Sequence, residues 1–244
     1  MEFQGIGSKF TAASVEALAV VVFKDDKATD GILKELDALT GGQVADTIKA
    51  KEINGGQGET ALIRFSAKGV KATRLLLVGC GERDKYKASS VAIASGTAAR
   101  TLRKLNLKSF AFDGRLSGET SEIAQNAVQG VITSQFELDK YKTKDKNTKS
   151  LSKFVVHVDG GKPADLKKGV ERGQIIGDSM NFARELANEP PNILHPTEMA
   201  KRAQAMAKEA GLKCEVLDEA KMEKLGMGSL ISVTKGSEQP AKLI

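Results

Sequence analysis

The sequence contains no tryptophan, few aromatic residues and two cysteines, and each shortage excludes a class of protein. Aromatic residues make up 5% of the 244 residues, so the core must be built mainly from Ala, Val, Leu and Ile. Cys80 and Cys214 lie far apart and form no CxxC or metal-ligand spacing, which excludes a disulfide scaffold and a zinc finger. The longest apolar run, Ala17 to Phe23, is too short to cross a bilayer, and no basic-then-apolar signal peptide opens the chain. We therefore expect a soluble, cytoplasmic protein with no membrane partner.

The positive charge of the chain is concentrated in one segment, Lys140 to Lys153, which we call the lysine loop. The segment contains six lysines and one acidic residue, Asp145, so it supplies +5 of the formal net charge of +6. Such a loop is typical of a solvated connector. The alternative is contact with a nucleic-acid backbone, which needs no sequence code and weakens with salt.

Short apolar or β-rich runs alternate with helical patterns through the first part of the chain. Strands are expected at Ala17 to Phe23, Thr60 to Phe65, Arg74 to Val78, Lys108 to Phe112 and Ser152 to Val158. Helices are expected from Ser89 or Ser90 to about Leu105, and over Gly118 to Phe136. This alternation predicts an α/β layered domain whose strands are buried on both faces.

The segment Asp159 to Pro163 breaks this pattern and is the predicted domain boundary. Beyond it, a helix over Ala164 to Ala187 carries small residues along one stripe, which indicates close packing on another helix or a sheet. Pro190 ends that helix, because the residue before a proline is pushed out of α space. The expected elements that follow are a helix over Thr197 to Ala210, a strand over Cys214 to Leu217, a short helix capped by Asp218 and ending at Gly226, and a strand beginning at Lys242 to Ile244.

No local motif carries a complete catalytic site. Gly79-Cys80-Gly81 follows a strand like a dinucleotide-binding turn, but Asp84 stands where the third glycine would be, so a tight strand-to-loop turn is the preferred interpretation. His157 and His195 have no second ligand at local spacing, which argues against a metal site at either. A Cys–His pair using Cys80 or Cys214 stays open, although nothing local activates either thiol.

One segment is specific enough to indicate a family. Ala183 to Thr197 reads ARELANEPPNILHPT, and it closely resembles the helix-and-loop junction of the leucine aminopeptidase (cytosol aminopeptidase) family. The resemblance continues through Ala210 to Leu212, Val216 to Glu219, Lys224 to Gly228 and Gly236 to Pro240. Weaker similarity to the family's N-terminal domain is seen at Leu75 to Gly81 and Phe136 to Thr143.

The resemblance implies a fold and an activity. It implies a macro-domain-like layered α/β domain over residues 1–163, followed over residues 164–244 by the incomplete opening segment of an α/β metallopeptidase domain. The family is identified with cytoplasmic, hexameric metallo-aminopeptidases, hydrolases that remove N-terminal residues from peptides with two bridged divalent metals, Zn or Mn. Those metals activate a water and polarise the scissile carbonyl.

The departures from the family pattern matter as much as the match. The family's NTDAEGR signature and VGKG opening are absent, so no catalytic, metal or substrate-binding residue is assigned in this sequence. We therefore predict a chain truncated before the metal site, inactive as given and binding no metal, in which Asn188 to Asn192 is a structural hinge. The alternatives are a nucleotide- or DNA-binding module that uses the Gly79 to Gly81 turn and the lysine loop, or a structural or regulatory subunit of an aminopeptidase hexamer.

Overall fold

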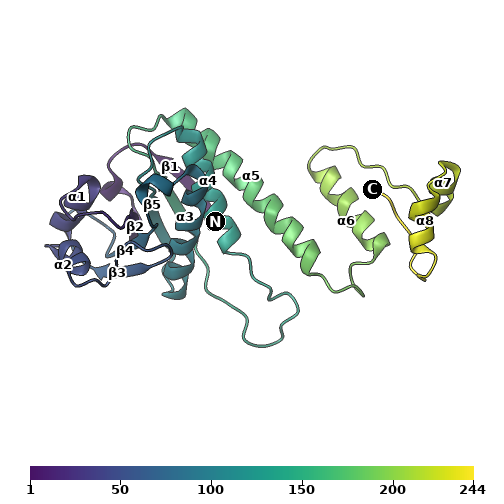
Figure 1. The fold of residues 1–244 in the computed structure, drawn as a ribbon, viewed down its shortest axis with the longest axis horizontal. Coiled ribbons are helices and arrows are strands. Elements are labelled where there is room, and N and C mark those ends of the chain that lie inside the picture. The colour runs from purple at the N-terminus through teal and green to yellow at the C-terminus, as the bar shows by residue number, and fades with distance from the viewer. The chain divides into compact units, whose positions relative to one another are not determined.

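The computed structural model describes residues 1–244, which form two compact units, residues 1–181 and residues 182–244. The first unit is built on a six-stranded sheet of order β1-β6-β5-β2-β4-β3 (Figure 1). Neighbouring strands pair in parallel except β3 and β4, which pair antiparallel. The strands are β1 (Glu2–Ile6), β2 (Ala17–Val22), β3 (Thr60–Arg64), β4 (Arg74–Gly79), β5 (Ser109–Asp113) and β6 (Lys153–His157).

Helices cover both faces of this sheet. One face packs against α1 (Gly31–Leu39) and α2 (Gln43–Lys49), and the other against α3 (Ala88–Lys104), α4 (Thr120–Ser134) and the start of α5 (Pro163–Asn188). Two short 3-10 helices, η1 (Phe10–Ala12) and η2 (Arg83–Lys85), lie in the connections.

The central strand β2 shows why the sequence forms a layered sheet. All six of its residues are buried, and alternate side chains enter opposite cores. Ala19 and Val21 pack on the α3–α4 side, whereas Leu18 and Val20 pack on the α1–α2 side. A strand covered on both faces exposes neither face to solvent, so its sequence is a nearly continuous apolar run. The predicted α/β layered fold is confirmed.

Glycines let α3, α4 and α5 approach closely. A Cβ on Gly130 of α4 would lie 2.1 Å from the carbonyl oxygen of Ala92 in α3. A Cβ on Gly173 of α5 would lie 2.6 Å from the carbonyl oxygen of Gln125 in α4. An added Cβ would lie 2.4 Å from the Ser121 carbonyl oxygen at Gly169 and 2.9 Å from the Cβ of Ile132 at Gly177. The small-residue stripe of α5 therefore packs on a helix, one of the two partners that the sequence allows.

Besides the two 3-10 helices, three elements of the first unit are not among the sequence expectations: β1, α1 and α2. Strand β1 is an edge strand of mixed exposure and contains Gly5, so it carries no clear alternating pattern. The two compact units divide at residue 181, within α5, whereas the sequence places a boundary at residue 163, where α5 begins. The difference arises because the first turns of α5 pack on α4.

The second unit contains α6 (Pro196–Glu209), α7 (Glu219–Lys224) and α8 (Gly228–Thr234), and the last of these was not expected. Asp218 caps α7 as predicted, its carboxylate accepting the backbone N–H of Lys221 at 2.9 Å. The strands expected at Cys214 to Leu217 and from Lys242 are wrong. The structure has one antiparallel bridge there, between Leu217 and Leu243, because no further strand lies beside them to extend a ladder.

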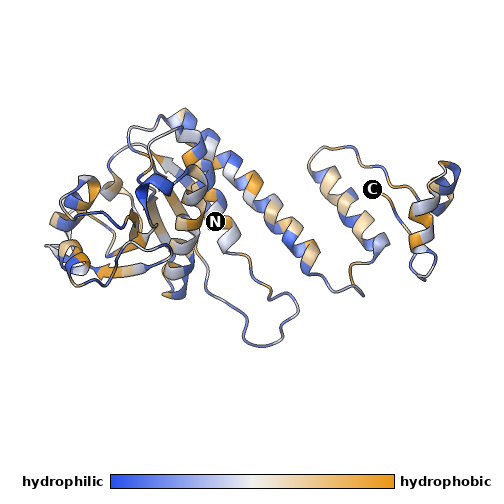
Figure 2. Ribbon diagram, in the orientation of Figure 1, coloured by the Kyte–Doolittle hydropathy of each residue, from blue (hydrophilic) through white to orange (hydrophobic).

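Hydrophobic and hydrophilic residues alternate along α5 rather than forming a continuous apolar surface (Figure 2). No helix of the chain has both the length and the apolar character needed to traverse a bilayer.

Candidate functional site

The carboxyl ends of β2 and β5 are where a doubly wound sheet usually binds its ligand. The chain leaves β2 toward α1 and α2 on one face, and leaves β5 toward α4 on the other. A crevice forms where connections diverge in this way. The residues that enter it are Phe23 to Asp26 after β2 and Gly114 to Arg115 after β5.

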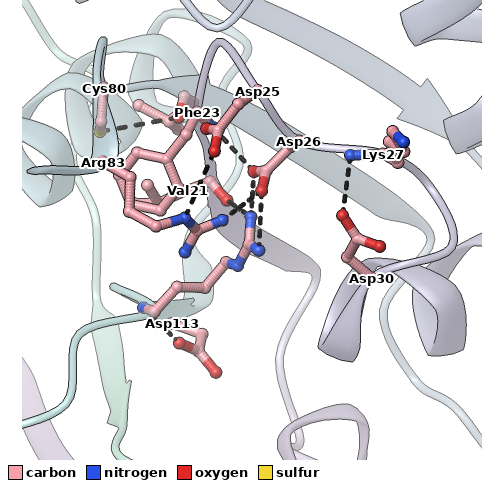
Figure 3. A network of polar contacts seen from close by, with 11 residues as sticks. Val21, Phe23, Asp25, Asp26, Lys27, Asp30, Cys80, Arg83 and Asp113 are labelled. Atoms are coloured by element: carbon pink, nitrogen blue, oxygen red, sulfur yellow. Dashed lines mark hydrogen bonds and ion pairs between the residues drawn. The ribbon is translucent and has the colours of Figure 1, made fainter.

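An internal ion-pair network lies here, and we call Asp26, Arg83, Arg115 and Phe23 the Asp26 network. Figure 3 labels Asp26, Arg83 and Phe23 within it. The side chain of Asp26 is fully buried and forms ion pairs with both guanidinium groups. Its carboxylate also accepts the backbone N–H of Phe23 at 2.7 Å. Arg115 donates to the carbonyl oxygen of Val21 at 2.9 Å, and Arg83 stacks 4.3 Å from the centre of the Phe23 ring. The network ties the connections after β2, β4 and β5 together.

The single negative charge of Asp26 balances one of the two positive charges in the network, and the remaining charge reaches solvent through Arg83. One buried carboxylate is shared by two arginines, and only Arg83 is half exposed, at 48% of its side chain. Both guanidinium groups also lie over the Phe23 ring, Arg115 at 5.4 Å. No local pattern in the sequence indicates this cluster, because Asp26 lies 57 residues from Arg83 and 89 residues from Arg115.

His157 lies beside the network as a buried core histidine. Its Nδ1 is 2.7 Å from Oδ2 of Asp113, its register partner on β5, and its side chain is 5% exposed. The other carboxylate oxygen of Asp113 accepts the backbone N–H of Arg115 at 2.7 Å. The Phe10 ring packs 5.4 Å from the imidazole. A cavity of about 230 Å³ adjoins this pair, but it brings no second histidine or cysteine to His157.

The Gly79-Cys80-Gly81 turn leaves no backbone N–H for a phosphate group. Gly79 donates to the carbonyl of Glu59 at 2.9 Å, Cys80 to that of Val22 at 3.0 Å and Gly81 to that of Gly55 at 2.7 Å. A Cβ on Gly79 would lie 2.1 Å from the carbonyl oxygen of Gly56. The glycine therefore serves close backbone packing, in agreement with the tight-turn interpretation.

Cys80 and Tyr86 line a cavity of about 250 Å³ next to this turn. Burial raises the pKa of the Cys80 thiol to about 12, and burial likewise raises the pKa of Tyr86 well above its ordinary value. The Cys80 thiol lies 3.7 Å from the carbonyl oxygen of Val78, and the Tyr86 hydroxyl has no hydrogen-bond partner. A reactive cysteine needs a lowered pKa, so this environment does not activate Cys80.

We predict that Cys80 reacts slowly with iodoacetamide at pH 8. The thiolate is the nucleophile, and a pKa of about 12 leaves only about one thiol in 10⁴ ionised at that pH, against about one in four for an ordinary cysteine. Peptide mapping by mass spectrometry should show labelling of Cys80 at least a hundredfold slower than that of free cysteine. The same protein unfolded in guanidinium is the control and should label at the ordinary rate. Fast labelling of the folded chain would contradict the raised pKa of the Cys80 thiol.

At least four of the six lysines in the lysine loop make internal contacts, one of them Lys140, whose Nζ lies 5.6 Å from the centre of the Tyr141 ring. Lys142 pairs with Asp139, Lys149 donates to the carbonyl of Lys104 at the end of α3, and Lys153 pairs with Glu2 at 3.1 Å. The hydrogen bond from the backbone N–H of Asn147 lowers the pKa of Asp139 most, and the hydrogen bond from the Lys142 side chain lowers it further. Residues 141–150 are exposed. These contacts favour a solvated connector, and nucleic-acid contact stays a prediction.

The Asn188 to Asn192 junction is held by a buried ion pair. The side chain of Glu189 is 1% exposed and accepts from Nη1 of Arg202 at 2.8 Å, while Nε of Arg202 donates to Glu198 at 3.2 Å. The hydrogen bond to Glu189 raises the pKa of Arg202 most, and the hydrogen bond to Glu198 raises it further. The carbonyl of Pro190 accepts two backbone N–H groups that follow it, so the junction is a tight turn. These contacts agree with a structural role.

His195 lies just after this junction and is partly buried, and its Nδ1 has no hydrogen-bond partner. Nowhere does the chain bring together three or more His, Cys, Asp or Glu side chains that could hold a metal ion. The residues present therefore do not fit the dimetal centre that the resemblance implies.

Comparison with known proteins places both units in one family. Residues 19–145 match the model of the cytosol aminopeptidase family N-terminal domain, and residues 181–244 match that of the family's catalytic domain. The chain is 41% identical to a probable cytosol aminopeptidase of Solibacter usitatus, covering 94% of this chain and 44% of the relative. It is 31% identical to that of Alkaliphilus metalliredigens, covering 100% and 50%. The chain thus spans about half the length of these curated relatives.

Solved structures show the same fold. A mutant of tomato leucine aminopeptidase aligns with a TM-score of 0.87 at 19% identity, covering 99% of this chain and 49% of that one. The bottromycin maturation enzyme BotP aligns with a TM-score of 0.70 at 21% identity, covering 93% and 44%.

Proposed function

Because the chain belongs to the cytosol aminopeptidase family, we propose that it is the N-terminal portion of a dimetal leucyl aminopeptidase. The activity is hydrolysis that releases N-terminal residues from peptides. Two observations support this: the family's N-terminal and catalytic domain models match in order along the chain, and the curated relatives are named probable cytosol aminopeptidases. The match of residues 181–244 to the catalytic domain is the observation that carries the proposal.

The proposed metals are two divalent ions, Zn or Mn, that activate water and polarise the scissile carbonyl when bound. The structure of BotP in complex with Mn supports a divalent ion in proteins of this fold. Since no cluster of His, Cys, Asp or Glu in this chain could hold a metal ion, we propose that the ligands lie in the part of the catalytic domain that these 244 residues do not span. No chemical step is assigned to this chain's own residues.

These residues are proposed to act as a scaffold for the enzyme. The Asp26 network fixes three connections at one edge of the sheet, and the Glu189–Arg202 pair fixes the turn that leads into α6. Assembly as a hexamer in the cytoplasm stays a prediction, and the name cytosol aminopeptidase supports the compartment. Two observations count against the nucleotide- or DNA-binding alternative. The backbone amides of the Gly79 to Gly81 turn are all hydrogen-bonded within the chain, and at least four of the loop's lysines have internal partners.

We predict that the purified 244-residue chain does not hydrolyse leucyl p-nitroanilide. With Mn or Zn added, turnover should equal that of a protein-free blank, because the chain brings no metal-ligand cluster to a substrate. The full-length relative from Solibacter usitatus, purified and loaded with metal in the same way, is the positive control. Clear turnover that copurifies with the 244-residue chain would show that a complete site is present and would overturn this part of the proposal.

A further inference from the structure

The cavity of about 250 Å³ beside the Gly79-Cys80-Gly81 turn contains none of the residues of the Asp26 network. It lies between the carboxyl end of β4 and the first half of α3. The α3 residues that line it are three or four positions apart, so they lie on one face of the helix: Ser90, Ile93, Ala94 and Thr97. The cavity therefore has a helix face on one side and the connections after β2 and β4 on the other.

The buried part of this lining carries no charge. Ala94 and Tyr86 are 2% and 7% exposed, and the Cys80 thiol is neutral at pH 7 because burial raises its pKa to about 12. Placing a charged group against such a surface costs desolvation energy that no partner returns. An apolar group, in contrast, gains from being removed from water there.

The exposed part of the lining is charged, and we call Lys24, Glu82 and Lys85 the charged mouth. Their side chains are 55%, 45% and 74% exposed. Nζ of Lys24 lies 3.7 Å from Oε1 of Glu82, and Nζ of Lys85 lies 2.5 Å from Oε2. Two ammonium groups and one carboxylate leave a charge of +1, which favours a ligand with one negative charge over a cation.

We propose that this cavity binds a small monocarboxylate, with its apolar tail against Ala94 and Tyr86 and its carboxylate at the charged mouth. A doubly charged ion such as phosphate would exceed the charge of the mouth and leave the apolar lining unused. The cavity equals roughly eight water molecules at about 30 Å³ each. The probe 4-methylpentanoate has about that many non-hydrogen atoms. This site is independent of the proposed aminopeptidase function.

Titration of the 244-residue chain with 4-methylpentanoate tests the proposal, followed by calorimetry and by the isoleucine methyl signals in NMR spectra. We expect a Kd of about 1 mM or tighter, within the range for ligands of this size. The Ile93 methyl signal, identified by its loss in Ile93→Val, should shift on binding. No saturable binding at ten times that concentration, or binding without a shift at Ile93, would overturn the proposal.

The charge of the ligand provides a second test. Leucine has a similar tail but is a zwitterion, and leucinamide has that tail with a positive charge. Affinity should fall in the order 4-methylpentanoate, leucine, leucinamide, with at least a tenfold difference between the first and the last. Equal affinities or the reverse order would show that the charged mouth does not select a carboxylate.

Substitutions in the mouth should change affinity in opposite directions. Lys24→Gln with Lys85→Gln turns the charge of the mouth from +1 to −1 and should weaken binding of 4-methylpentanoate at least tenfold. Glu82→Gln raises that charge to +2 and should tighten binding at least threefold. Weaker binding by the Glu82→Gln variant would overturn the proposal.

The matched control is Lys27→Gln with Lys87→Gln, which removes the same number of charges from exposed lysines that do not line the cavity. This pair should leave the affinity within twofold of wild type. Equal weakening by the two lysine pairs would mean that the net charge of the surface, and not a site, attracts the ligand. All the changed side chains are exposed, and circular dichroism of each free variant checks that folding is intact.

Discussion

Replacing Asp26 with alanine is expected to destabilise the first unit by about 3 kcal/mol, since removing one member of a buried ion pair leaves the other charge uncompensated. The Arg115 side chain is 10% exposed and would keep its charge without a carboxylate. The backbone N–H of Phe23 would lose its acceptor at the same time. Arg83 is half exposed and can turn to solvent, so the loss falls mainly on Arg115.

Urea unfolding followed by circular dichroism measures this effect. The matched control is Asp25→Ala, which removes the adjacent carboxylate: its side chain is 69% exposed and lies 4.0 Å from Arg83. Exposed ion pairs contribute little, so the control should change the free energy of unfolding by less than about 0.5 kcal/mol. Asp26→Asn keeps an acceptor for Phe23 without the charge and should fall between the two. Equal stability of the alanine variant and wild type would mean that the network is not a structural clamp.

Gly130→Ala is expected to lower the melting temperature of the first unit although alanine is the better helix former. Helix propensity alone favours alanine by about 1 kcal/mol. The added Cβ would lie 2.1 Å from the carbonyl oxygen of Ala92 and 2.5 Å from the Ser95 hydroxyl oxygen. Ser95 itself donates to the carbonyl of Ala127, so α3 and α4 would have to separate and weaken that bond. Overpacking costs about 1–3 kcal/mol, and a contact of 2.1 Å to a backbone atom belongs at the upper end of that range. After the gain of about 1 kcal/mol in helix propensity, we expect a net loss of about 2 kcal/mol.

Thermal unfolding should show this as a drop of about 4–8 °C for a unit of this size. Gly228→Ala at the start of α8 is the control, because nothing lies within 4 Å of the Cβ it would add. That variant should not be less stable than wild type. A Gly130→Ala protein that melts at or above the wild-type temperature would show that α3 and α4 accommodate the methyl group.

Local sequence patterns were sufficient to predict two kinds of element: strands buried on both faces, and helices ended by a proline. The apolar runs at β2 and β4 indicate strands directly, because most side chains of a strand covered on both faces are apolar. The end of α5 at Asn188 follows from the proline two residues later. Edge strand β1 was missed because its pairing with β6, some 150 residues away, compensates for a weak local pattern.

The prediction of a strand at Cys214 to Leu217 is wrong because a suitable local pattern lacks a pairing partner. Its residues favour extended backbone, but a strand also needs a neighbour to complete its hydrogen bonds, and only Leu243 pairs with it. The sequence predicts a hinge at Asn188 to Asn192 but not the contact that fixes it. Nothing in the local pattern indicates that Glu189 is buried in an ion pair with Arg202.

By itself, the sequence determined the α/β layering, the ends of the long helices, the family resemblance and the absence of the family's metal-site motifs. Only the tertiary structure decided that Asp26 forms ion pairs with both Arg83 and Arg115, and that the Gly79 to Gly81 amides are all engaged. The physical reason is distance along the chain. Periodicity and helix ends depend on residues a few positions apart, whereas ion pairs and hydrogen-bond partners depend on which connections the topology brings to the same edge of the sheet.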